Sequence, residues 1–164
     1  MRTDPNLTQP RIPLTSEQVG ELLAIYNPDH RYVEEAVLQG PELRCLVKQV
    51  DYPFTVDAHF FPYITAPTAA LLVAQLSYVL IGGMALTSSF RIPLSWTGFI
   101  QCRDLARLRF VRVGVRYRRE VQGGPQHAVA RLVEYRDAPR GFFSWMTFRI
   151  GDGIVADAVG QLQR

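Results

Sequence analysis

The stretch APTAALLVAQLSYVLIGGMAL, residues 66–86, decides the fold. It contains no charged side chain, and no carboxylate occurs between Asp57 and Asp104. About twenty apolar residues can span a bilayer, but Pro67, Thr68, Gln75 and the pair Gly82-Gly83 dilute this run, and the flanking segments have strand patterns. We therefore predict a long helix that is buried within a soluble protein on nearly all sides.

A histidine precedes this helix, in the segment Ala58-His59-Phe60-Phe61-Pro62. Imidazole is suited to moving protons near neutral pH, so His59 is a candidate acid-base residue. The first turn of the helix has unpaired N–H groups, which makes Thr68 and Ala69 the candidate oxyanion hole. Two plainer interpretations stay open: a structural histidine, and an ordinary helix start satisfied by Thr65.

Periodicity and turn residues predict the other elements. A loose arm precedes a short helix over 16–26, whose start has Thr15 and Gln18 at capping-box spacing. Alternating strands surround the central helix, while 88–104 gives no clear pattern. The predicted strands are 32–38, 43–50, 108–121, 127–137, 141–152 and 154–162, and residues 51–66 form the loop that carries His59.

Composition bounds the class of protein. The chain has 164 residues, of which 48% are hydrophobic and 20% charged, as in one soluble domain with a substantial core. The net charge is +3, and a basic band attracts nucleic acid, a phosphate-bearing cofactor or an acidic carrier protein. A solvated strand face explains the band equally well, and no nucleic-acid-binding motif accompanies it. The band consists of Arg103, Arg107, Arg109, Arg112, Arg116, Arg118 and Arg119.

The two cysteines, Cys45 and Cys102, have no neighbours at metal-ligand spacing. We expect two buried thiols, with no metal site and no disulfide framework. Residues 1–13 lack the charged-then-apolar order of a signal peptide. We therefore expect a cytoplasmic protein.

The order of elements, two strands, a buried helix and a curved antiparallel meander, is an α+β arrangement that resembles the hot-dog fold of acyl thioester enzymes. This resemblance covers roughly residues 30–162. We expect one hot-dog domain over 1–164, with an N-terminal arm and short helix at 1–29. The resemblance also implies a homodimer or a dimer of dimers, with active sites between subunits.

His59-Phe60 followed by Pro67-Thr68 resembles the motif of hot-dog dehydratases that act on hydroxyacyl carriers. In those enzymes a glutamate or aspartate follows inside the helix, about fourteen residues after the histidine. Val73 stands at that position here. Because dehydration needs a second proton-transfer group, the missing acid argues against it.

The segment Ala69–Tyr78 with its Gln75-Leu76 centre resembles the FcoT-type family of hot-dog acyl-CoA thioesterases. That family includes enzymes similar to those that add glycine to an enoyl thioester during β-amino acid biosynthesis. The resemblance implies a fatty acyl substrate on the phosphopantetheine of coenzyme A or an acyl carrier protein, with no other cofactor. His59 then activates the amine or water. Candidate donors to the glycine carboxylate are Tyr52, Tyr63, Gln75 and Thr87, and the acyl tail is expected along Ala74, Gly82, Gly83 and Ala85.

Three functions therefore remain open. The first is Michael addition of glycine to an α,β-unsaturated thioester, with hydrolysis of the product as an additional step. The second is plain hydrolysis of a fatty acyl thioester, and the third is acyl binding without catalysis. We rank the addition first because a single histidine and an oxyanion hole suffice for it.

Overall fold

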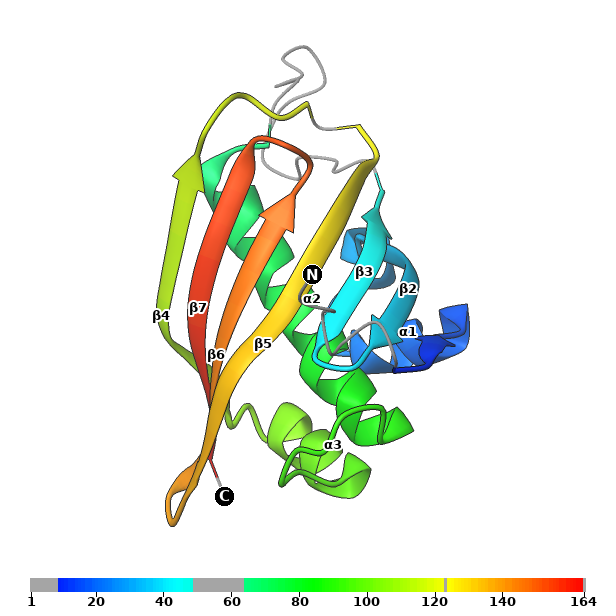
Figure 1. Ribbon diagram of the computed structural model, residues 1–164, viewed down its shortest axis with the longest axis vertical. Helices are drawn as coiled ribbons and strands as arrows, with labels where there is room; N and C mark the ends of the chain where they lie inside the picture. The colour runs from blue at the N-terminus through cyan, green and yellow to red at the C-terminus, as the bar shows by residue number, and fades with distance from the viewer. Residues whose placement is uncertain (1–8, 49–63, 123, 164) are drawn as a thin grey trace, which may run out of the picture.

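The computed structural model describes residues 9–48, 64–122 and 124–163, and in it a seven-stranded sheet curves around one long helix (Figure 1). This is the α+β hot-dog arrangement that the sequence predicts. The elements in chain order are β1 (Arg11–Pro13), α1 (Ser16–Leu22), the 3-10 turn η2 (Pro28–His30), β2 (Val33–Gln39), β3 (Glu42–Val47), α2 (Ala66–Thr87), α3 (Trp96–Asp104), β4 (Leu108–Tyr117), β5 (Gln126–Ala138), β6 (Gly141–Ile150) and β7 (Ile154–Leu162).

Every neighbouring pair of strands is antiparallel, in the order β1-β2-β3-β5-β6-β7-β4. Strand β4 follows α2 and α3 in the chain, yet it lies at the edge of the sheet next to β7 (Figure 1). The opposite edge is the three-residue strand β1. The sheet therefore has one short edge and one long edge.

One face of the sheet covers α2, and the other faces solvent. In β7 the side chains alternate strictly between buried and half-buried: Ile154, Ala156 and Ala158 are buried, while Val155 and Asp157 are partly exposed. Such alternation is expected for an antiparallel sheet packed on one side only. The core therefore lies between the sheet and α2.

Helix α2 is long and apolar enough to cross a membrane by length and composition, and it is the only such helix among the described residues. However, 72% of its most apolar window is buried within the protein. Burial on this scale is typical of the core helix of a globular domain. It agrees with the predicted central helix.

The N-terminal segment adds β1 to the edge of the sheet and packs α1 against α2 and β2. Thr15 and Gln18 form the predicted capping box, in which each side chain accepts a hydrogen bond from the other residue's backbone N–H. Helix α1 ends at Leu22, four residues before the predicted end. Two tight turns follow, in which the N–H of Ala24 donates to the carbonyl of Glu21 and the N–H of Tyr26 donates to the carbonyl of Leu23. Such turns are common at helix ends.

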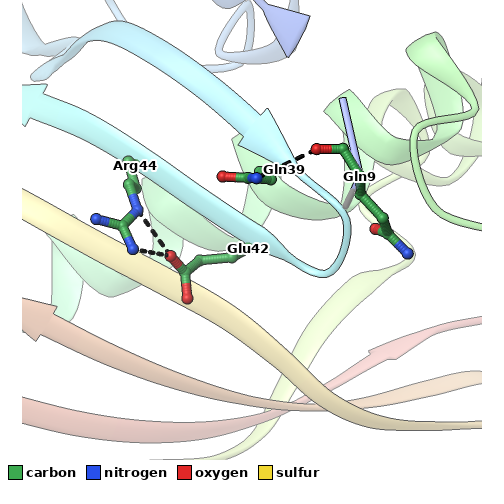
Figure 2. Close-up of polar contacts among 4 residues, drawn as sticks. All are labelled: Gln9, Gln39, Glu42 and Arg44. Carbon is green, nitrogen blue, oxygen red and sulfur yellow. Dashed lines mark hydrogen bonds and ion pairs between the residues drawn. The ribbon is translucent and has the colours of Figure 1, made fainter. Parts of the chain in front are cut away.

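Two polar contacts lie at the β2–β3 hairpin and at the sheet edge beside it (Figure 2). The side-chain amide of Gln39 donates to the carbonyl of Gln9 at 3.1 Å, which holds the start of the described chain against β2. Within β3, Arg44 donates to one carboxylate oxygen of Glu42, two residues before it, at 2.7 and 2.8 Å. Glu42 is thus already paired.

The segment without a sequence prediction contains α3. Ser95 begins it, because its hydroxyl accepts from the N–H of Gly98 at 3.1 Å. Near its end, Arg103 is buried, pairs with Asp104 at 2.7 Å and donates to the backbone carbonyl of Glu21. This arginine of the predicted basic band therefore joins α3 to the end of α1.

Candidate functional site

The start of α2 is an uncharged helix terminus at one end of the sheet, with Ala66 and Pro67 exposed and Thr68 and Ala69 buried. Thr65 occupies the N-cap position, Pro67 lies in the first turn, and no acidic residue is present in that turn. Immediately before the helix, the N–H of Ile64 donates to the carbonyl of Val121 at 2.8 Å. This bond fixes the helix start beside the segment that follows β4.

Only one of the two predicted oxyanion donors has its backbone N–H available. The N–H of Ala69 donates to the carbonyl of Thr65 at 2.8 Å inside the helix, so the prediction that Ala69 supplies a donor is wrong. The N–H of Thr68 has no acceptor within the described part of the chain. Thr65 makes no side-chain cap bond, and its hydroxyl instead lies 3.1 Å from the hydroxyl of Thr68. The Thr65 side chain therefore does not cap the helix, while its carbonyl accepts from Ala69, as at an ordinary helix start.

Three of the predicted site residues, Tyr52, His59 and Tyr63, lie outside the described residues. The chain reaches α2 through Ile64 and Thr65, so the segment that carries His59 joins directly to the helix start. Their roles stay predictions.

Gln75 does not line an open site. It is fully buried, its side-chain oxygen accepts from the N–H of Tyr32 at 2.8 Å, and its side-chain nitrogen donates to the carbonyl of His30 at 2.6 Å. Both ends of the amide are thus used to hold the start of β2 against α2. The prediction that Gln75 binds the nucleophile's carboxylate has to be corrected to this structural role.

Thr87 lies at the opposite end of α2 from Thr68. At 1.5 Å per residue the two are separated by roughly 28 Å along the helix axis. The Thr87 hydroxyl donates to the carbonyl of Gly83 at 2.7 Å and accepts from the N–H of Ser89 at 3.3 Å. The prediction that Thr87 binds substrate beside the helix start is therefore wrong for a single subunit.

The two glycines of α2 allow neighbouring side chains to pack directly against the helix backbone, which leaves no room there for an acyl tail. A Cβ on Gly82 would collide with Leu22 and would lie 2.5 Å from Phe99 Cζ, while one on Gly83 would lie 2.9 Å from Leu38. We predicted space for the acyl tail along Ala74, Gly82, Gly83 and Ala85. At the two glycines this space is occupied by neighbouring side chains. Of the two alternatives for these glycines, close packing is correct.

The structure adds a carboxylate that the sequence analysis missed. Glu120 precedes Val121, the residue whose carbonyl is bonded to Ile64, and its side chain is exposed. Glu120 is far from the helix in sequence, so only the pairing of Ile64 with Val121 reveals its position. The pairing brings the backbone of Glu120 near the start of α2, while its side chain is exposed.

The arginine band does not form one continuous surface. Arg103 is buried, and three others pair with carboxylates on the neighbouring strand or turn: Arg112 with Asp157 at 2.6 Å, Arg116 with the same residue at 4.0 Å, and Arg119 with Asp152 at 2.5 Å. These contacts support a solvated strand face for most of the band, and surface pairs of this kind add little stability.

Both cysteines are buried and free, as predicted. Burial raises the pKa of the Cys45 thiol to about 12, so it stays protonated and unreactive near neutral pH. Burial likewise raises the pKa of Tyr26 and of Tyr78, which stack edge to face. Within the three described ranges, no three His, Cys, Asp or Glu side chains gather as metal ligands.

The long helix enclosed by a curved antiparallel sheet is the hot-dog fold, and solved structures share it. No protein-family model and no curated protein matches the sequence. Thioesterase HI1161 of Haemophilus influenzae has a TM-score of 0.55 at 11% identity, covering 90% of both chains. A mutant of thioesterase PA1618 from Pseudomonas aeruginosa has 0.53 at 13%, covering 92% of this chain and 94% of its own. Zebrafish thioesterase superfamily member 2 has 0.53 at 15%, covering 89% and 94%.

Proposed function

We propose that the protein hydrolyses fatty acyl thioesters, with the thioester carbonyl held at the start of α2. The observation that carries this proposal is the uncharged start of a 22-residue helix, where Thr68 is buried and its N–H is left without an acceptor among the described residues. A helix N-terminus carries a partial positive charge, which favours an oxygen that becomes negative during reaction. The names of the three similar structures agree with this chemistry.

The reaction needs one base and one oxyanion donor. His59 is proposed to take a proton from water as the water oxygen attacks the carbonyl carbon, and then to return that proton to the departing thiolate. The Thr68 N–H holds the carbonyl oxygen during this step. Glu120 is an additional candidate for orienting water or the histidine, because it directly precedes Val121, the residue bonded to Ile64.

Addition of glycine to an enoyl thioester is the second candidate. In its favour, α2 carries no carboxylate along its whole length, and a single base suffices for the addition. Against it, glycine's carboxylate needs buried donors, and two of the four predicted donors, Gln75 and Thr87, are committed to other bonds. Hydrolysis therefore ranks ahead of addition.

We further propose a homodimer joined through β4, with the acyl group carried by coenzyme A or a carrier protein. Strand β4 is a ten-residue edge strand with exposed Val111, Val113 and Tyr117. Long edge strands with exposed apolar side chains favour pairing with another strand. The opposite edge, β1, is only three residues long and ends at Pro13, which suits a free edge.

The decisive experiment incubates the purified protein with saturated and α,β-unsaturated acyl thioesters, with and without glycine. Hydrolysis predicts thiol release without glycine and a free acid of unchanged acyl mass. Addition predicts a product that is heavier by one glycine and is formed only when the amine is present. His59→Ala should abolish either reaction, whereas His127→Ala, which removes an exposed histidine on β5, should not. If no thioester is turned over, both hydrolysis and glycine addition are excluded, and acyl binding without catalysis is the function that remains.

A further inference from the structure

The solvent-facing side of the sheet, which lies in front of α2 in Figure 1, has a hollow of about 360 Å³ on its surface. Three arginines from different segments line it: Arg131 on β5, Arg149 on β6 and Arg118 just after β4. Val129, Val155 and Thr147 also line it. The hollow thus has an apolar floor, one hydroxyl, three cations and one carboxylate, that of Glu42.

Strand register brings the arginines to one place. Arg131 lies opposite Thr147, and Arg149 lies opposite Val129, so the two arginines are diagonal neighbours on adjacent strands. Arg118 is fixed at the end of its strand because its N–H donates to the carbonyl of Gly153 at 2.7 Å. Like charges at this spacing repel one another unless an anion lies between them.

The carboxylates around the hollow are already occupied. Glu42, which also lines it, is held by Arg44 (Figure 2). Asp157 is held by Arg112, and Asp152 by Arg119. Arg131 lies directly opposite Glu42 in the strand register, but the ion pair that Glu42 forms is with Arg44. Across the described ranges, Arg118, Arg131 and Arg149 form no ion pair, in contrast to the neighbouring arginines.

We propose that this hollow binds a phosphate dianion, either free or as the monoester end of a larger molecule. Guanidinium groups bind phosphate oxygens in pairs of parallel hydrogen bonds, and three converging ones can neutralise a dianion. The Thr147 hydroxyl supplies a further donor, and the valine floor suits an organic group attached to the phosphate. A segment of acidic protein fits less well, because its carboxylates would be spread over a surface larger than this hollow.

This site is independent of the hydrolysis proposed above. It lies on the face of the sheet turned away from α2, whereas the thioester is placed at the helix start. Direct binding measurements test it without any assay of turnover. Failure of the thioesterase proposal would leave the prediction for phosphate unchanged, and the reverse also holds.

The test is a titration of the full-length protein with inorganic phosphate by calorimetry, at constant ionic strength set with chloride. We expect one saturable site, and we expect Arg131→Gln with Arg149→Gln to raise the Kd by about tenfold or more, because each charged hydrogen bond contributes substantially to binding. Arg136→Gln is the matched control, since Arg136 is an exposed arginine on the same strand that does not line the hollow. Circular dichroism should show all variants folded.

One further ligand identifies the source of the phosphate. Adenosine 3′-monophosphate that binds more tightly than inorganic phosphate indicates a monoester, and equal or weaker binding indicates free phosphate; both outcomes support the site. Absence of saturable phosphate binding overturns the proposal. An equal loss of affinity in the Arg136→Gln control overturns it as well, as does an oligoglutamate peptide that binds the hollow while phosphate fails to displace it.

Discussion

The side-chain oxygen of Gln75 accepts a hydrogen bond from the backbone N–H of Tyr32 at 2.8 Å, inside the core. The same amide donates to the carbonyl of His30, so one glutamine in the middle of α2 satisfies two backbone groups at the entry to β2. A buried backbone group without a partner destabilises a fold, which explains a fully buried polar residue in an apolar helix. Gln75 therefore fixes where the sheet begins relative to the helix.

Gln75→Leu should destabilise the protein strongly. The leucine keeps the apolar volume but leaves the Tyr32 N–H and the His30 carbonyl without this partner, and each such loss costs about 1–3 kcal/mol when buried. We expect the free energy of unfolding to fall by roughly 2–4 kcal/mol in chemical denaturation. Gln101→Leu, at an exposed position of α3, is the control and should change it by less than about 0.5 kcal/mol. Equal effects of the two substitutions would show that the buried amide has no special role.

Two helical glycines should respond in opposite directions to alanine. Gly82→Ala places a methyl group against Leu22 and Phe99, and overpacking of this kind lowers stability by about 1–3 kcal/mol. Gly20→Ala in α1 has only one neighbouring atom, at 3.7 Å from the new Cβ, and should raise stability by up to about 1 kcal/mol through helix propensity. Thermal unfolding of both variants checks this. A stabilising Gly82→Ala would mean that unfilled space does exist beside α2.

Local patterns predicted most of the fold. Alternation of buried and exposed residues in the C-terminal strands, the capping box at Thr15 and the charge-free run of α2 are each signals contained within one element. Helix α3 was missed because its main local signal is one capping hydroxyl, that of Ser95, and its sequence mixes apolar and polar residues with a weak apolar period. Such a helix forms because its few apolar residues, Phe99 above all, pack against α2.

The site could be predicted only in part, because its geometry depends on distant pairings. The sequence placed Thr68 at a helix start, but it could not show that the carbonyl of Thr65 already takes the N–H of Ala69. It treated Gln75 and Thr87 as available donors, whereas the partners of Gln75 lie more than forty positions away. Glu120 escaped notice for the same reason, since the bond between Ile64 and Val121 joins two otherwise unrelated segments.

The Cys45 thiol should make stability depend on pH in the alkaline range. Its pKa is raised by burial from an ordinary 9.0 to about 12 in the folded protein. Between these values the unfolded chain loses the proton and the folded chain keeps it, so the free energy of unfolding falls as pH rises above about 9, by up to about 1.4 kcal/mol per pH unit. Cys45→Ala should flatten this part of the curve relative to the unmodified protein, measured by denaturation at a series of pH values. Parallel curves would exclude the thiol as the cause.

The dimer proposed through β4 can be tested with two matched valines. Val111 on β4 and Val133 on β5 are both 62% exposed, and both lie where the strand register shifts. Val111→Asp adds a charge at the free edge and should convert a dimer into a monomer, whereas Val133→Asp, on an interior strand, should leave the dimer intact. Sedimentation equilibrium gives the mass of each variant. If the unmodified protein is a monomer at micromolar concentration, the proposal of a homodimer joined through β4 is wrong.

The role of the Thr68 N–H can be separated from that of its side chain by two substitutions at one position. Thr68→Pro removes the N–H in the first turn, where the helix makes no use of it and proline is tolerated. If this N–H holds the oxyanion, thioester turnover should fall by about 10²–10³, mainly in kcat. Thr68→Ala keeps the N–H and loses only the hydroxyl contact with Thr65, so its kcat should stay within about threefold of the original, because removing one hydroxyl contact away from the carbonyl costs under 1 kcal/mol. Ala66→Pro introduces a proline two residues earlier in the same turn and controls for general distortion of the helix start. Equal losses in the Thr68→Pro and Ala66→Pro proteins would assign the effect to distortion, while a loss confined to Thr68→Pro identifies the donor.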